Sequence, residues 1–180
     1  MRVLIDACVL YPTILRRLVL GLAATGAFTP LWSARILEEW ARAAARDGSA
    51  SEAVARGEIE AARARFPAAE VAPAPGVEAK LALPDPDDRH VLAAAIAGGA
   101  EELLTLNVRD FPIRALGVHG VLRRHPDEFL LEAFHADPAA MGALVGEVHG
   151  RAVADGIDLG RRALLKKARL PRLGKAMEAA

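Results

Sequence analysis

The sequence predicts an α/β protein with a central parallel sheet, followed by a helical C-terminal extension. Two short apolar runs, residues 2–6 and 102–106, alternate with longer helical patterns, which is typical of parallel strands joined by helices. The composition agrees, because 39 of the 180 residues are alanine, which favours helix. After about residue 125 every pattern is helical.

The first half of the chain begins with the buried strand that ends at Asp6. Apolar residues three or four positions apart then mark helices, and Pro12, Gly26 and Ser33 mark helix ends. Three prolines in a stretch of ten residues indicate a loop. In chain order we expect helices over 12–26, 34–47 and 51–66, a loop over 67–76 and an extended segment over 77–83.

The middle of the chain carries the clearest helix. Asp85 can cap it, Pro86 suits its first position, acids fill its first turn, and Gly98 ends it. A second buried strand, an exit loop and a last strand follow, over 102–106, 107–112 and 118–122. The remaining patterns predict helices over 126–134, 138–154, 159–167 and 173–177. We therefore expect one domain over 1–122 and a helical extension over 123–180.

Charge and cysteine content limit the classes of protein to which this chain can belong. The net charge is zero, with 23 basic and 23 acidic residues, but residues 150–180 carry 8 basic and 3 acidic side chains. This basic end either binds an anionic partner or is simply solvated. One cysteine excludes an internal disulfide framework. We find no apolar run of membrane-spanning length and no secretory signal, so we expect a cytoplasmic protein without a membrane segment.

Most of the candidate functional side chains lie at or after the ends of the predicted strands. If the strands over 2–6 and 102–106 are neighbours, their carboxyl ends bring acidic and amide side chains together. Several carboxylates without a histidine or cysteine pattern suit Mg²⁺ or Mn²⁺, which can support in-line attack on a phosphate. The candidates are Asp6, Glu39, Asp88, Thr105, Asn107 and Asp110.

Each candidate also has a structural interpretation. Helix capping alone explains Asp85, Asp87 and Asp88. Cys8 is interpreted as a small buried hydrophobe, and His90 either packs in the core or lines the cleft. Asp6 is the hardest to explain without function, because a carboxylate that follows a buried strand needs a partner.

Four passages together resemble the PIN-domain ribonucleases, especially the VapC-like toxins of bacterial toxin–antitoxin pairs. They cover roughly residues 1–122, and their order and spacing are more specific than any one of them. The passages are Val3-Leu4-Ile5-Asp6-Ala7, Ile36-Leu37-Glu38-Glu39-Trp40, the run from Leu83 through Pro84-Asp85-Pro86-Asp87-Asp88 to Ala95, and the run from Leu104 through Thr105-Leu106-Asn107 to Pro112.

The resemblance implies a three-layer α/β/α domain and a metal-dependent endoribonuclease. The family's acidic site carries over onto Asp6, Glu39 and Asp88. Its fourth acid falls on Asn107, a neutral ligand, and Asp110 can take its place directly or through a water. The resemblance further implies that Thr105 contributes its hydroxyl and that Arg109 approaches a phosphate.

The resemblance also implies partners: an RNA substrate, a cognate antitoxin protein and a second copy in a homodimer. The substitution at Asn107 keeps an alternative open, a non-catalytic PIN-like module that binds RNA or protein. A phosphatase of the haloacid-dehalogenase type is disfavoured, because those enzymes need a second acid where this chain has Cys8.

Overall fold

The computed structural model describes residues 1–179, which form two compact units. The first unit comprises Met1–Tyr11 and Phe28–Arg124, and the second comprises Pro12–Ala27 and the residues from His125 onward. The domain boundary predicted between residues 122 and 123 stays a prediction. The second unit also includes the segment Pro12–Ala27 near the N-terminus.

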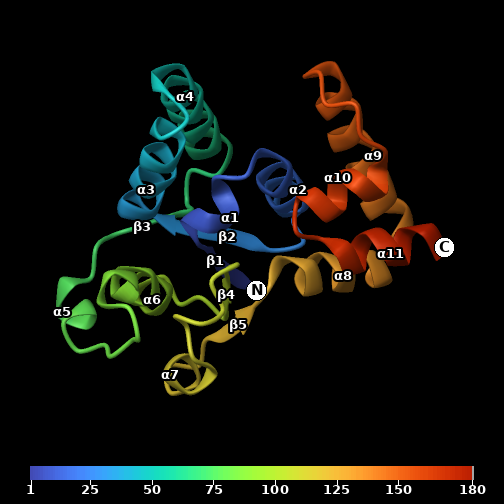
Figure 1. The fold of residues 1–180 in the computed structure, drawn as a ribbon. Helices are drawn as coiled ribbons and strands as arrows, with labels where there is room; N and C mark the ends of the chain where they lie inside the picture. Colours follow the sequence, from blue (N-terminus) through green and yellow to red (C-terminus); the bar gives the residue numbers. More distant parts are fainter. Residues whose placement is uncertain (180) are drawn as a thin grey trace. The chain divides into compact units, whose positions relative to one another are not determined.

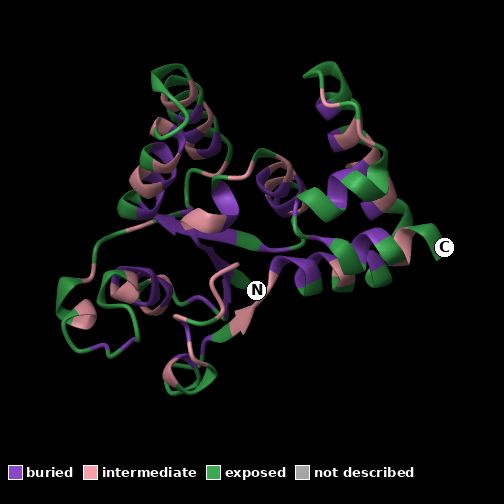
Figure 2. Cartoon of the chain, viewed as in Figure 1, coloured by how far each residue is buried: buried purple, intermediate pink, exposed green. Residues whose placement is uncertain are grey.

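The first unit is built on a five-stranded, all-parallel sheet in the order β3-β2-β1-β4-β5 (Figure 1). Its central strands β1 and β4 are buried, as Figure 2 shows. In the register, Leu4 pairs with Leu31 on one side and with Leu103 on the other. The strands are β1 (Arg2–Ile5), β2 (Thr29–Ser33), β3 (Glu70–Val71), β4 (Glu102–Leu104) and β5 (Leu122–Arg124).

Helices cover both faces of this sheet. Figure 1 shows α3 and α4 on one side and α6 on the other, which is the predicted three-layer α/β/α arrangement. Ser33 caps α3 as predicted, because its hydroxyl accepts the Ile36 N–H at 3.2 Å. The helices of this unit are α1 (Ala7–Leu10), α3 (Ala34–Ala45), α4 (Ser49–Arg65), α5 (Pro75–Glu78), the 3₁₀ turn η1 (Pro86–Asp88), α6 (Arg89–Ala97) and α7 (Ile113–Gly117).

Strand β2 was not predicted, and it contains a proline, which is normally excluded from central strands. Pro30 lies in β2, between β1 and β3. Thr29 donates its N–H to the β1 side and Trp32 donates to Ala69 on the β3 side, so the nitrogen of Pro30 also faces β3. Pairing with β3 begins only at Trp32. The missing N–H of Pro30 therefore removes no ladder hydrogen bond.

Other predicted boundaries were wrong where short elements depend on tertiary contacts. β3 lies inside the predicted loop over 67–76, and it forms only because two residues pair with β2. The segment over 77–83 is not extended, because Pro75 starts the short helix α5. The last strand covers residues 122–124 instead of 118–122, since α7 and a turn at Gly120 precede it.

The C-terminal half of α6 packs tightly on two strands of the sheet. An added Cβ at Gly98 would lie 2.8 Å from Val71 Cγ2 and 2.9 Å from Leu31 Cδ1. The φ of Gly98 is −79°, so its backbone places no demand for glycine. Packing at this helix end is therefore close, and an added methyl group would force the side chains of Val71 and Leu31 to shift.

The second unit is entirely helical, which confirms the predicted helical character of the C-terminal part. Within it α2 packs on α9, and an added Cβ at Gly21 would lie 2.5 Å from Leu144 Cδ1. No helix within residues 1–179 is both long and apolar enough to cross a membrane. The helices are α2 (Thr13–Ala24), α8 (Pro126–Ala136), α9 (Pro138–Ala154), α10 (Arg161–Lys167) and α11 (Pro171–Ala179).

A buried carboxylate joins α8 to α11. Asp127 is 4% exposed, and its two oxygens accept the backbone N–H groups of Arg172 and Leu173, each at 3.0 Å. These are among the first N–H groups of α11, which have no partner inside their own helix. Asp127 therefore caps α11 from a distance in sequence of about 45 residues.

Candidate functional site

The candidate site begins where β1 and β4 end side by side. Asp6 and Thr105 follow paired strand ends, and the Asp6 N–H donates to Leu104 O at 3.1 Å. The Thr105 hydroxyl donates to Asp6 Oδ2 at 2.6 Å. Both side chains are buried, and the Asp6 carboxylate does not cap the following helix α1. The strands predicted to be neighbours are therefore neighbours, and they bring these two groups together.

Cys8 is part of the same cluster, which the sequence did not predict. Its thiol donates to Asp6 Oδ2 at 3.0 Å, and its sulfur accepts the Leu106 N–H at 3.2 Å. Burial and the nearby Asp6 carboxylate raise the pKa of the Cys8 thiol. Cys8 therefore stays protonated and acts as a hydrogen-bond donor that orients Asp6. It is more than the small hydrophobe that the sequence suggested.

The carboxylates of Asp85, Asp88 and Asp110 form a second group. One oxygen of each lies within 4.8 Å of the others. Asp85 caps η1, since its Oδ1 accepts the Asp87 N–H at 2.9 Å. Asp88 makes no such side-chain bond, although it precedes α6. Capping therefore explains Asp85 and does not explain Asp88.

Asp88 is electrostatically strained. Its Oδ2 is buried and has no hydrogen-bond partner among the described residues. Desolvation, followed by the negative charges of Asp6, Asp85 and Asp110, raises the pKa of Asp88 to about 6. His90 opposes this rise only in part, and Asp88 forms no ion pair among the described residues. The arrangement fits a divalent cation, because the donors are hard oxygen atoms that repel one another without one.

The loop after β4 links both groups. The Asn107 N–H donates to Thr105 Oγ1 at 2.9 Å, and the Asn107 side-chain amide donates to Asp110 Oδ2. Asp110 thus lies next to Asn107 as well as next to Asp88. This geometry is consistent with Asp110 supplying the negative charge that Asn107 lacks. Arg109 is exposed in the same loop.

Glu39 is held by neighbours other than the clustered carboxylates. Its Oε1 lies 2.8 Å from His90 Nε2 and 3.5 Å from Arg35 Nε. His90 is buried in the first turn of α6, two residues after Asp88, and its Nδ1 has no partner among the described residues. The structure thus ties Glu39 to the segment that carries Asp88, but not directly to a candidate metal ligand.

Comparison with known proteins identifies the family. The PIN domain family model matches residues 2–109, more than half of the chain, and the chain belongs to the PIN domain family. This match confirms the family that the four sequence passages resemble.

A curated relative makes the likeness more specific. The Mycobacterium tuberculosis protein named Putative ribonuclease VapC50 is 41% identical over 58 residues, which are 32% of this chain and 34% of that protein. The chain therefore matches about a third of the length of this relative. No solved structure matched.

Proposed function

We propose that this protein is an endoribonuclease that depends on Mg²⁺ or Mn²⁺ and hydrolyses RNA phosphodiester bonds. The observation that carries the proposal is Asp88, whose buried oxygen has no partner and whose pKa is raised by burial and by three neighbouring carboxylates. A site of this kind gains free energy when a cation binds. Membership of the PIN domain family and the likeness to a protein named as a ribonuclease support RNA as the substrate.

Asp6 is the best-oriented ligand of the proposed site. The Thr105 hydroxyl and the Cys8 thiol both donate to its Oδ2. These two bonds anchor Oδ2 and leave Oδ1 as the oxygen proposed to bind the ligand. Because Thr105 also accepts the Asn107 N–H, a single hydroxyl positions the first strand end and the following loop together.

Asp6, Asp88, Asp110 and the amide oxygen of Asn107 would hold the cation. The bound cation would polarise the scissile phosphate and the attacking water. Asp88 and Asp110 hold negative charge at the site, which keeps the cation in place while a polyanion approaches. Arg109 is exposed in the same loop and is proposed to bind a substrate phosphate.

Glu39 is proposed to complete the catalytic set by orienting the attacking water or completing the metal site. His90 fixes one of its oxygens, so the other oxygen is the one available for this role. Because Glu39 is about one-third exposed, water can reach it.

The proposed biological role is the toxin of a toxin–antitoxin pair. The partners in that proposal are a cognate antitoxin protein and a second copy of the chain in a homodimer, and the proposed location is the cytoplasm. Support comes from the relative named as a VapC ribonuclease.

Asn107 supports one alternative function, a PIN module that binds RNA without cleaving it. Its amide already donates to Asp110, and it brings no charge of its own to the site. Such a module would bind RNA equally well with and without divalent metal.

Calorimetry with Mn²⁺ and an RNA cleavage assay test the proposal on the wild type, Asp6→Asn and Asp87→Asn. In Asp6→Asn the new amide oxygen can still accept the Thr105 hydroxyl, so we expect a folded variant whose Mn²⁺ affinity falls by roughly 100-fold and whose cleavage is lost. Asp87 is exposed and outside the carboxylate group, so Asp87→Asn is the matched control and keeps both. An active Asp6→Asn protein would refute the mechanism.

A further inference from the structure

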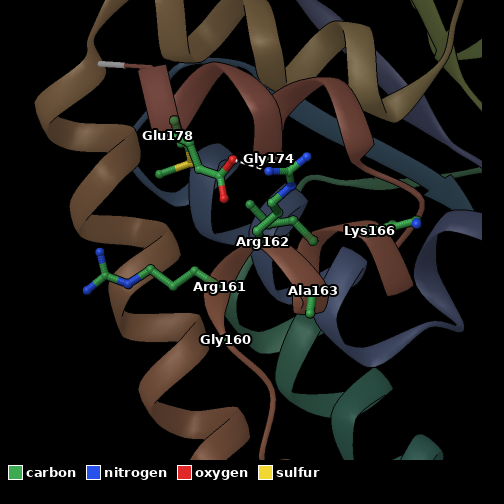
Figure 3. A pocket seen from close by; sticks show the side chains of 9 residues that line it. Gly160, Arg161, Arg162, Ala163, Lys166, Gly174 and Glu178 are labelled. Atoms are coloured by element: carbon green, nitrogen blue, oxygen red, sulfur yellow. Dashed lines mark hydrogen bonds and ion pairs between the residues drawn. The ribbon is translucent and has the colours of Figure 1, made fainter.

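The second unit contains a groove between α10 and α11 that the proposed nuclease site does not use. It has a volume of about 600 Å³. Buried Leu165 and Gly174 and the partly exposed Met177 line its apolar part, while the exposed Arg161, Arg162 and Lys166 carry positive charge along it. Figure 3 shows the side chains of Arg161 and Lys166 extending away from the ribbon, with Arg162 directed toward Glu178.

The segment that forms this groove is strongly basic, and most of its basic side chains are unpaired. Seven basic residues and no acid lie between positions 161 and 175, and all seven are exposed. Arg162 pairs with Glu178 and Arg172 pairs with Glu128. Among the residues that the structure describes, the other five have no acid within ion-pair distance: Arg161, Lys166, Lys167, Arg169 and Lys175.

Pairing in the first unit is mixed: Arg46, Lys80 and Arg109 are exposed and have no acid within ion-pair distance among the described residues, whereas other arginines are paired. Arg56 pairs with Glu38 and Glu52, and Arg63 pairs with Glu60 and Glu70. Since the chain as a whole has no net charge, the unpaired cations of α10 and α11 reflect a local separation of charge. Such a separation attracts a polyanion at long range.

We propose that this groove binds single-stranded RNA as a second contact for the substrate, an inference that rests on the proposed nuclease function. Phosphates would contact Arg161 and Lys166, and an unstacked base would lie against the partly exposed side chain of Met177. Arginine suits this role because its guanidinium both contacts phosphate and stacks on bases. Single-stranded RNA fits better than a duplex, since only unstacked bases expose their faces.

Glu178 allows a second test, in which RNA binding is expected to become tighter instead of weaker. It holds Arg162 in an ion pair at the side of the groove, so an RNA phosphate must compete with it. Removing the charge of Glu178 should therefore tighten RNA binding, whereas removing Arg161 and Lys166 should weaken it. A groove without a role in RNA binding would show neither effect.

Fluorescence anisotropy with a fluorescein-labelled uridine 20-mer in EDTA measures these effects without cleavage. For R161Q/K166Q, the loss of two phosphate contacts predicts a Kd raised roughly 60-fold at about 50 mM salt and roughly tenfold at about 200 mM. The slope of log K against log salt should fall by about 1.4. At about 200 mM salt, E178Q should bind roughly threefold more tightly, by releasing one such cation.

The control is R46Q/K80Q, which removes one arginine and one lysine from exposed positions of the first unit. Equal weakening in R161Q/K166Q and in this control would overturn the proposal, because RNA would then respond to net charge alone. Unchanged affinity in R161Q/K166Q would also overturn it and leave the groove to a protein partner or a second copy of the chain. Matching circular dichroism spectra establish that the variants are folded.

Cleavage is scored separately by adding Mn²⁺ to the same RNA. RNA that binds through the groove and is not cut refutes the nuclease function and supports the groove as an RNA site. If the RNA is cut and R161Q/K166Q binds it as tightly as the control does, the result supports the nuclease function and overturns the proposal that the groove binds RNA.

Discussion

The substitution Asp88→Asn should stabilise the metal-free protein while removing its metal site. Asp88 is repelled by Asp6, Asp85 and Asp110 and has a buried oxygen without a partner among the described residues. Its pKa is raised from 3.8 to about 6, so the folded state binds the proton more tightly than the unfolded state. The carboxylate therefore destabilises the fold increasingly as the pH rises from about 4 to about 6, and fully above that range.

The size of the effect follows from the same values. A pKa raised from 3.8 to about 6 would correspond to about 3 kcal/mol for a fully buried group. Asp88 is only half-buried, and solvent screening reduces this to about 1 kcal/mol. We expect Asp88→Asn to raise the free energy of unfolding by about 1 kcal/mol at pH 8 in EDTA, and by little at pH 4.5.

Urea unfolding followed by tryptophan fluorescence is the suitable assay. Both tryptophans, Trp32 and Trp40, are buried in the first unit and report on it. Mn²⁺ should then stabilise the wild type and leave Asp88→Asn unchanged, which reverses their order of stability. The reasoning is refuted if Asp88→Asn is less stable than the wild type at pH 8 in EDTA, because the carboxylate would then have a stabilising partner.

Two further substitutions test the packing of each unit. Asp127→Asn should lower the free energy of unfolding by about 2–3 kcal/mol, because one charge-assisted bond to the α11 backbone is lost and the new buried NH₂ group faces a backbone N–H group. The control Asp137→Asn, at the N-cap of α9, should be nearly neutral. Urea titrations followed by circular dichroism measure both variants, and equal effects would contradict this reasoning. Gly98→Ala should lower the free energy of unfolding by about 1–3 kcal/mol, because the added methyl group overpacks against β2 and β3. The control Gly76→Ala has open space around it and should leave the free energy of unfolding unchanged. A Gly98→Ala protein as stable as the wild type would show that the strands can shift.

The strongest local patterns in the sequence were enough to predict the strands and helix caps around the candidate site. A buried apolar run ending in Asp6 and a second ending near Thr105 identified the two strands that form its base. Ser33 and Asp85 were correctly predicted as caps, because capping depends on residues only two or three positions away. The family resemblance added Arg109, and the roles of Arg109 and Glu39 remain predictions.

Contacts between distant segments could not be predicted in the same way. The bond between Cys8 and Asp6 was missed because a cysteine after a strand looks like any small apolar residue. The contact between Glu39 Oε1 and His90 Nε2 joins two helices about 50 residues apart, and no local pattern marks it. β2 was missed for a related reason, since Pro30 is tolerated only because β3 is short.

The place of α2 in the second unit has a consequence for synthesis of the chain. This helix follows β1 closely, yet the helix on which it packs, α9, begins only at Pro138. At ordinary translation rates, the roughly 110 residues between them take about 6–20 s to appear. During that time α2, whose Leu15, Leu18 and Val19 are buried in the finished protein, lacks the contacts that α9 provides. Nascent chains that stop before α9 thus expose an apolar helix, and this is the stage at which a chaperone would protect the protein from aggregation.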